Sequence, residues 1–340
     1  MSSLQLLWFA LSGVLFAGFF FLEGFDFGVG MATKFLARNH EEREQVIKTI
    51  GPVWDGNEVW LITAGGAMFA AFPFWYASLF SGYYLVLLAI LVGLIIRGVS
   101  FEFHHRMPMD KKPIWINTLF TGSLIIPFFF GVMFISLIQG MPMDAQGHIR
   151  ASFTDYINLF SIVGGVAMTL LSYLHGLNYL ALKTTGAIHT RAVEQAKKLY
   201  PVLYVGLVAF AGLLYLKTDF FSTKLVPTLL LVVLIVALSA LAHFSVLNHR
   251  EWPAFLSSGL TFVAIVALLF VGLFPRVMIS SLGSEFDLLI QNATSAPYTL
   301  KMMTWVTVTI LPFVLAYTIW TYYIFRHRIK PSKQQTEETR

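Results

Sequence analysis

Four carboxylates lie within or at the edge of long apolar stretches: Glu23 and Asp26 in the first stretch, Asp55 and Glu58 in the second. A spacing of three residues places each pair on one face of a helix. A charged side chain in a bilayer costs roughly 2.5–3.5 kcal/mol on insertion scales, so it must be paired, protonated or in contact with water. Repulsion between neighbouring carboxylates and desolvation both favour the protonated form. These residues therefore predict a proton relay.

A structural role for the same acids is the alternative interpretation. The acids would then hold helices together through hydrogen bonds to Asn57, Trp54, Trp60 or a partner chain. Arg97, at the inner end of the third apolar stretch, is the candidate cation that neutralises one of them. We favour the relay, with Asn57 included in the pathway, because acids inside a membrane are rare and mark proton or ion pathways.

The elements that position these residues are membrane-spanning helices. Of the 340 residues, 57% are hydrophobic and 12% are charged, about half the charged fraction of a soluble domain. The chain has no cysteine, which excludes disulfides, iron–sulfur clusters and thiolate-bound metals within it. Apolar runs long enough to cross a bilayer predict an all-α membrane protein, a single domain over 1–340, with nine helices. These lie near 5–33, 51–72, 76–97, 114–138, 156–180, 200–217, 226–246, 253–275 and 302–325.

The distribution of basic residues gives the orientation, because Lys and Arg are retained on the cytoplasmic side. With the N-terminus outside, eighteen of the 23 basic residues fall in inner segments, from Lys34 to Lys333 and Arg340. The outer segments hold only Arg150, Lys217, Lys224, Arg276 and Lys301. We therefore expect an outer N-terminus and a cytoplasmic C-terminus. Basic residues spread over five inner segments follow from this topology and do not predict a nucleic-acid site.

A weak internal repeat predicts how the helices are grouped. The sequence EGFDF at 23–27 ends the first span, and HGLNY at 175–179 ends the fifth. After a polar connection of similar length, KTIGPV at 48–53 opens the second span and KLYPV at 198–202 opens the sixth. Parallel repeats of this kind predict two four-helix bundles, spans one to four and five to eight, with a ninth, peripheral helix.

Small and aromatic residues beside the acids predict packing rather than chemistry. Gly24 and Gly28 form a small-residue face that lets another helix approach closely. Trp54 and Trp60 are expected to pack or to lie at the membrane interface.

Histidine is the side chain to examine for haem ligation. Of nine histidines, only His175 and His243 lie within apolar stretches. A single histidine inside a membrane is more often a hydrogen-bonded core residue than a ligand. We expect no redox centre and no metal bound by this chain alone.

Two motifs resemble the second subunit of cytochrome bd-type quinol oxidases: EGFDFGVG at 23–30 and GPVWDGNEVWL at 51–61. Further similarity lies in RGVSFEF at 97–103, GMPM at 140–143, LFPRVM at 273–278 and LPF at 311–313. The resemblance covers nearly the whole chain, and the form of the first motif with Glu23 is similar to the shorter versions from Gram-positive bacteria.

The resemblance implies a function in the bacterial cytoplasmic membrane. The family's complex oxidises a membrane quinol and reduces oxygen to water, with haem b and haem d bound by the larger subunit I. The second subunit packs against the first and is implied to contribute a proton route from the cytoplasm. The resemblance assigns the role of proton relay most directly to Asp26 and Asp55. It assigns the role less directly to Glu58, because some family members have Gln at this position. A structural quinone, an oxygen route and a small single-helix subunit occur in some members.

Two other functions fit the residues alone. A proton-coupled secondary transporter suits acids within Gly-rich helices, although transporters more often contain inverted repeats. A purely structural subunit would cover the hydrophobic flank of a partner. Haem absorbance and a co-purifying second chain distinguish the oxidase from the transporter, and acid-to-amide variants distinguish a relay from a structural subunit.

Overall fold

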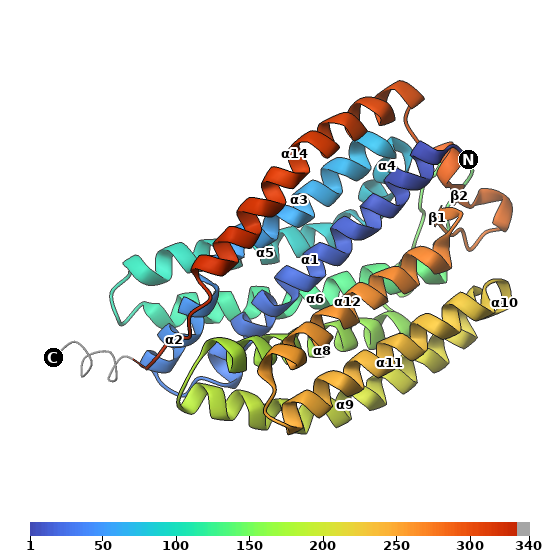
Figure 1. The fold of residues 1–340 in the computed structure, drawn as a ribbon. Coiled ribbons are helices and arrows are strands. Elements are labelled where there is room, and N and C mark those ends of the chain that lie inside the picture. Colours follow the sequence, from blue (N-terminus) through green and yellow to red (C-terminus); the bar gives the residue numbers. More distant parts are fainter. Residues whose placement is uncertain (332–340) are drawn as a thin grey trace.

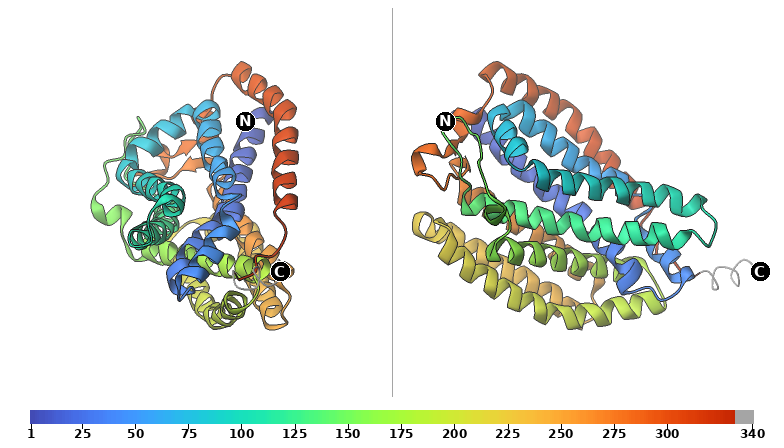
Figure 2. Two further views of the ribbon diagram at one scale, coloured as in Figure 1. Left: turned by 90° about the vertical axis from the view of Figure 1, so that its left-hand side faces the viewer. Right: turned by 180° about the vertical axis from the view of Figure 1, so that it is seen from behind.

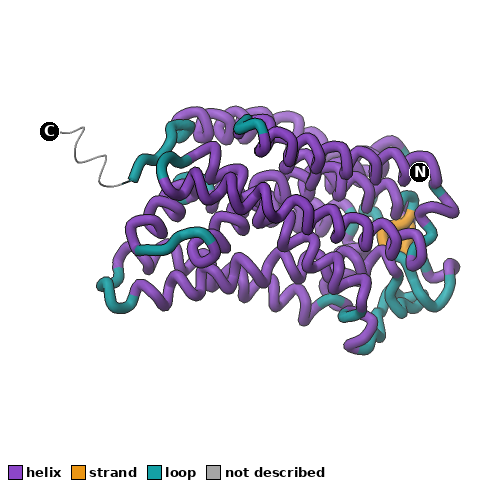
Figure 3. The backbone as a smooth tube through the Cα atoms, turned by 90° about the horizontal axis from the view of Figure 1, so that it is seen from below, coloured by secondary structure: helices purple, strands orange, loops and turns teal. Residues whose placement is uncertain are grey.

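The computed structural model describes residues 1–331 and consists almost entirely of helices. The long helices are α1 (Ser3–Phe35), α3 (Trp54–Ala71), α5 (Tyr84–Arg106), α6 (Lys112–Gln139), α8 (Leu159–Lys183), α9 (Ala187–Lys217), α11 (Leu225–Leu247), α12 (Glu251–Leu273) and α14 (Pro297–Ile324). The shorter elements are α2 (His40–Ile50), α4 (Pro73–Gly82), α7 (Phe153–Tyr156), α10 (Phe220–Thr223), α13 (Ile290–Ala293), a 3₁₀ turn at Ser284–Phe286, and the antiparallel strands β1 (Arg276–Met278) and β2 (Leu288–Leu289). The strands occur at one end of the molecule only (Figure 3).

The long helices run roughly along one axis and form two groups (Figures 1 and 2). In the first group, α1 packs on α3 and α6, and α5 packs on α6. In the second group, α8 packs on α9 and α12, and α11 packs on both α9 and α12. Helix α14 lies along the outside of α1 and α3 (Figure 1). Helices α1 and α6 of the first group also pack on α8 of the second, so the two groups share a broad interface. The division into two four-helix bundles and a peripheral helix stays a prediction.

Eight helices in the described part of the chain are long and apolar enough to cross a membrane. They are all the long helices except α3, which corresponds to the expected span at 51–72 but has 18 residues with Asp55, Asn57 and Glu58 near its start. The start of α1 and the end of α14 lie at opposite ends of the bundle (Figure 1), as an odd number of crossings requires. Helix α3 as a ninth span, and the orientation, remain predictions; Lys333 and Arg340 lie outside the described residues.

The connections between the long helices contain further helical segments. The bounds predicted for the third span, 76–97, are wrong. A separate short helix, α4, occupies Pro73–Gly82, and the long helix α5 runs from Tyr84 to Arg106. Proline is tolerated in the first turn of a helix because its missing N–H has no partner there, and Pro73 starts α4 in this way. Apolar runs mark the part of a helix within lipid, whereas backbone hydrogen bonding continues into polar sequence. Helix α9 accordingly begins at Ala187 rather than near 200, and the polar connection after α1 contains α2.

The two groups meet along α8, which packs on both α1 and α6. Helix α1 crosses α8 at two glycines. A Cβ atom on Gly28 would lie 2.1 Å from the carbonyl oxygen of Ser172 and 2.7 Å from the Cα of Gly176. Only glycine permits this approach of the two backbones. Gly24 instead faces the ring of Phe262, where a Cβ atom would lie 3.0 Å away. The expected small-residue face therefore serves a helix crossing at Gly28 and an aromatic contact at Gly24.

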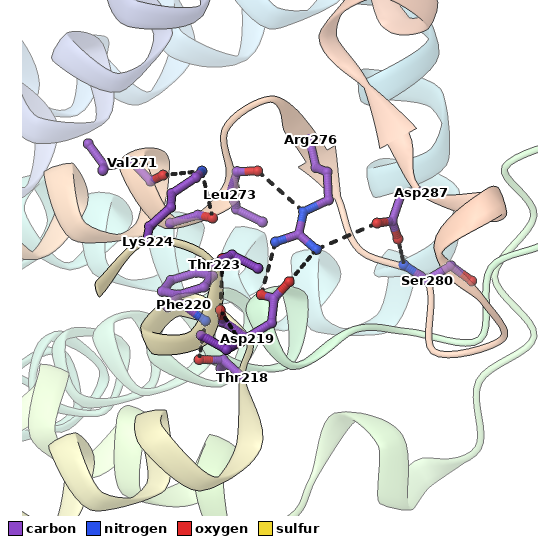
Figure 4. Close-up of polar contacts among 12 residues, drawn as sticks. Thr218, Asp219, Phe220, Thr223, Lys224, Val271, Leu273, Arg276, Ser280 and Asp287 are labelled. Atoms are coloured by element: carbon purple, nitrogen blue, oxygen red, sulfur yellow. Dashed lines mark hydrogen bonds and ion pairs between the residues drawn. The ribbon is translucent and has the colours of Figure 1, made fainter. Parts of the chain in front are cut away.

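Charged groups at the end carrying β1 and β2 fasten α10 and the β1–β2 segment to α12 (Figure 4). Arg276 donates from Nη1 and Nη2 to the two carboxylate oxygens of Asp219, at 2.8 and 2.9 Å, and lies 3.6 Å from Asp287. Lys224 donates to the carbonyl of Val271 at 2.7 Å, near the C-terminus of α12. A cation at a helix C-terminus complements the helix dipole. Arg276 and Lys224, two of the five basic residues expected on the outer side, thus bind other segments of the chain.

Candidate functional site

Glu23 and Asp26 lie on the inner side of α1, and both side chains are fully buried. They project from the middle of the bundle, where α1 contacts helices of both groups. Their spacing of three residues directs both toward the space between α1, α3 and α5. The structure thus brings the two acids of α1 into one polar cluster.

Arg97 of α5 is the cation of this cluster. Its Nη1 forms an ion pair with Oε1 of Glu23, and both side chains have no exposed surface. The same nitrogen lies 4.0 Å from Oε2 of Glu58, whose side chain is 19% exposed. The guanidinium lies over the rings of Phe27 and Phe101, at 5.1 and 5.4 Å from their centroids. One buried cation is therefore shared between two acids from different helices.

Asn57 of α3 connects the cluster to a further helix. Its Nδ2 donates to Oδ2 of Asp26 at 2.7 Å and to the carbonyl of Leu22 at 3.4 Å. Its Oδ1 accepts a hydrogen bond from the hydroxyl of Tyr322 on α14, at 2.7 Å. Asp26 is thereby held by a chain of hydrogen bonds that runs through three helices.

Asp55 does not join this cluster. It is exposed on the outer side of α3, whereas Asn57 is buried and Glu58 is partly buried. The prediction that Asp55 and Glu58 share one helix face therefore does not bring Asp55 into the cluster: Glu58 reaches Arg97, whereas Asp55 faces outward. Residues three apart on a helix differ in direction by about 60°, so one side chain can border the interior while the other faces outward.

Several buried polar atoms of the cluster have no hydrogen-bond partner within residues 1–331: Glu23 Oε2, Asp26 Oδ1, and Arg97 Nε and Nη2. Buried polar atoms are normally paired, and those without a protein partner are served by ordered water. Carboxyl groups, a fixed cation and sites for water are the parts of a proton-transfer path. The cluster therefore contains the kinds of group that proton transfer requires.

Trp54 packs beside the cluster, and Trp60 packs on α1 at Gly18. Trp54 stacks on Phe101, with 4.7 Å between ring centroids and an interplanar angle of 20°. Trp60 covers Gly18, where a Cβ atom would lie 2.3 Å from the indole ring. Trp54 and Phe101 thus form an aromatic layer beside Arg97, and Trp60 fixes α3 on α1.

The two histidines within the apolar stretches of the sequence, His175 and His243, have hydrogen-bonded partners. In His175, Nδ1 lies 2.7 Å from Ser258 Oγ, Nε2 lies 3.0 Å from the carbonyl of Phe21, and the ring stacks on Phe255. Nδ1 of His243 lies 3.0 Å from the hydroxyl of Tyr204. Both nitrogens of His175 are engaged, so its packing does not fit an axial ligand of haem.

Sequence reasoning missed Tyr322 of the cluster. It follows Asn57 by 265 residues on a helix that is otherwise largely exposed, and a tyrosine near a helix end is typical of a membrane interface. No local pattern distinguishes a Tyr that points inward from one that anchors a helix in lipid.

Comparisons with known proteins identify the family. Residues 4–325 match the family model described as cytochrome bd terminal oxidase subunit II. The chain belongs to this family. It is 48% identical over 337 residues to cytochrome bd ubiquinol oxidase subunit 2 from Bacillus subtilis, covering 99% of this chain and all of that protein. It is 35% identical to cytochrome bd-I ubiquinol oxidase subunit 2 from Escherichia coli K12, covering 96% of this chain and 95% of that one.

A solved structure supports the fold of this family member. The structure of the bd oxidase from Geobacillus thermodenitrificans matches with a TM-score of 0.72 and 13% identity, covering 95% of this chain and 99% of that chain. The resemblance stated from the two motifs is thus confirmed. The chain is a subunit of an oxidoreductase complex of the bacterial cytoplasmic membrane, in which haem and quinol take part beside a subunit I partner. Membership of this family favours the oxidase over a secondary transporter.

Proposed function

We propose that this subunit supplies a route for protons from the cytoplasm to the site of oxygen reduction, which lies with its haems in subunit I. The observation that carries the proposal is the buried cluster of Glu23, Asp26, Asn57, Glu58 and Arg97. Reduction of oxygen to water consumes protons, and a membrane subunit can deliver them only through groups that exchange protons inside the bilayer. Acids buried within transmembrane helices typically serve this role.

The charges of the cluster suit a relay better than a purely structural contact. The Arg97 guanidinium is shared between Glu23 and Glu58, and Asp26 lies in the same cluster, so the cluster can gain or lose a proton without leaving an isolated charge in lipid. We propose that protons enter near Asp55 and Glu58 and pass along Asp26 and Glu23 with bound water. Asn57 holds Asp26 in place at 2.7 Å, and Arg97 balances the negative charge.

The exposed face of α3 is the surface that we propose meets subunit I. Gly56, Val59, Thr63 and Gly66 follow one another along it, all exposed, and a Cβ atom at Gly56 or Gly66 would meet nothing within 4 Å. Small residues on one helix face allow another helix to approach closely. Asp55 lies at the start of this surface, where a carboxylate is poorly suited to face lipid.

Replacing Asp26 by Asn tests the route. The amide keeps the size of the side chain but cannot carry a proton, so oxygen consumption by the complex should fall at least about tenfold. Haem absorbance and co-purification of subunit I should stay at wild-type levels. Asp110→Asn, in the exposed turn between α5 and α6, is the matched control. Normal turnover in the assembled Asp26 variant would count against the relay and favour a structural subunit.

A further inference from the structure

A second polar cluster lies at the C-terminal end of α5, the helix that carries Arg97, and the predicted orientation places this end on the cytoplasmic side. Oε1 of Glu44 on α2 lies 2.8 Å from Nε2 of His104, 3.0 Å from Nζ of Lys112 and 3.4 Å from Nε2 of His40. His104 belongs to α5 and is 1% exposed, whereas the side chain of His40 is 35% exposed. The cluster thus runs from water at His40 to a buried imidazole at His104.

The buried face of α5 connects this cluster with the relay. That face is apolar at Val86 and Ile90, then carries Arg97, Ser100 and His104 in its last turns. The seven residues from Arg97 to His104 rise about 10 Å along the helix. Between them, Oγ of Ser100 lies 2.6 Å from Oγ1 of Thr118 on α6. Buried polar groups on one face of a membrane helix indicate a polar path along it.

The second ring nitrogen of His104 also bears on its role. Its Nδ1 is buried and has no hydrogen-bond partner within the described residues, although Nε2 is engaged by Glu44. A buried polar atom of this kind is normally served by ordered water. One ring nitrogen of His104 therefore contacts the carboxylate, and the other is directed away from it.

We propose that His104, held by Glu44, is a cytoplasmic proton-collecting site that feeds the Arg97–Glu23 cluster along α5. This inference rests on the proton route proposed above. Uptake of a proton from cytoplasmic water converts the neutral imidazole to imidazolium, and its loss toward Ser100 restores the neutral ring. Glu44 stays ionised throughout, so one proton enters and one leaves in each cycle.

The charged groups around His104 suit this role. The hydrogen bond from His104, with a further one from Lys112, lowers the pKa of Glu44 to about 2 despite its partial burial. Glu44 therefore provides a fixed negative charge 2.8 Å from Nε2 of His104, an arrangement that orients a histidine acting as general acid and base. The other groups facing the cluster are His40 on α2 and Lys112 on α6, with Arg43 near His40 and His105 next to His104 on α5.

The test measures oxygen consumption by the membrane-bound complex from pH 6 to pH 8.5. His104→Gln keeps a hydrogen-bonding side chain but cannot shuttle protons, and His105→Gln, exposed at the next position, is the matched control. We expect the two variants to agree near pH 6, and His104→Gln to fall about fivefold below the control at pH 8.5, where protons are scarce. Equal rates at every pH would overturn the proposal.

Two further variants separate the possible failures. His104→Ala should be slow at pH 8.5 and regain turnover with added imidazole, whereas a fully assembled variant that imidazole does not restore would overturn the proposal. Asp26→Asn measured in parallel tests the underlying route. If oxygen consumption is slow in Asp26→Asn but normal in His104→Gln, only the collecting site is rejected. If it is normal in Asp26→Asn, the route itself is rejected.

Discussion

The hydroxyl of Tyr322 donates a hydrogen bond to Oδ1 of Asn57 at 2.7 Å, and this contact determines which way the Asn57 amide faces. With its oxygen engaged by Tyr322, Asn57 presents Nδ2 to Asp26. The peripheral helix α14, which has few contacts with the rest of the chain apart from α1 and α3, therefore helps to set the hydrogen bonding of the acid at the centre of the cluster.

Removing that hydroxyl tests whether α14 contributes to the relay. In Tyr322→Phe the Asn57 amide loses the partner that orients it, so Asp26 is held less firmly, and oxygen consumption should fall about threefold, the effect expected for one hydrogen bond. Tyr323→Phe, exposed at the next position, should behave as wild type. Oxygen-electrode rates of both assembled complexes decide the question, and equal rates would show that the Tyr322 contact has no part in turnover.

Part of this site was predictable from the sequence. The spacing of Glu23 and Asp26 within one apolar stretch placed both on one helix face, and Arg97 was the cation closest in depth. The rotation of α3 was not predictable, because its apolar and polar residues do not separate into clear faces, and so Asp55 was expected inside. Tyr322 and His104 could not be identified, since neighbours on other helices decide where each points.

The buried pair of Arg97 and Glu23 predicts a specific pattern of assembly. Arg97→Gln leaves Glu23 without its cation inside the bundle, and breaking a buried pair in this way costs about 3–5 kcal/mol. The yield of assembled complex should fall sharply. Adding Glu23→Gln removes the orphaned charge and should restore assembly, while turnover stays low because the relay lacks both groups. Haem content per milligram of membrane protein measures assembly.

A surface pair serves as the control for that experiment. Arg106 and Glu102 lie 3.4 Å apart with side chains 78% and 64% exposed, and pairs of this kind contribute little to stability. Arg106→Gln should leave assembly unchanged. If Arg97→Gln alone assembled as well as Arg106→Gln, the buried ion pair could not be important for folding.

The close crossing of α1 and α8 predicts strong intolerance at Gly28. Even alanine would place its methyl group 2.1 Å from the carbonyl oxygen of Ser172, so the helices must separate, at a cost of about 1–3 kcal/mol for overpacking. Gly206→Ala on α9, where nothing lies within 4 Å of the added atom, is the control and should be tolerated. Thermal unfolding of the detergent-solubilised complex should show a lower midpoint for Gly28→Ala only.

The charge of Glu44 predicts how stability depends on pH. Hydrogen bonds from His104 and Lys112 lower its pKa from 4.5 to about 2 in the folded protein, so its stabilising effect is complete above pH 4.5 and is lost as the pH falls toward 2. Because the group is only partly buried, this effect is on the order of 1 kcal/mol after screening. Glu44→Gln should therefore lower the unfolding midpoint at pH 7, and the difference from wild type should shrink between pH 4.5 and about 3. Glu41→Gln, exposed on the same helix, should show no such pH-dependent difference. A deficit of Glu44→Gln that stayed constant down to pH 3 would mean that packing, rather than the charge of Glu44, fastens α2 to α5 and α6.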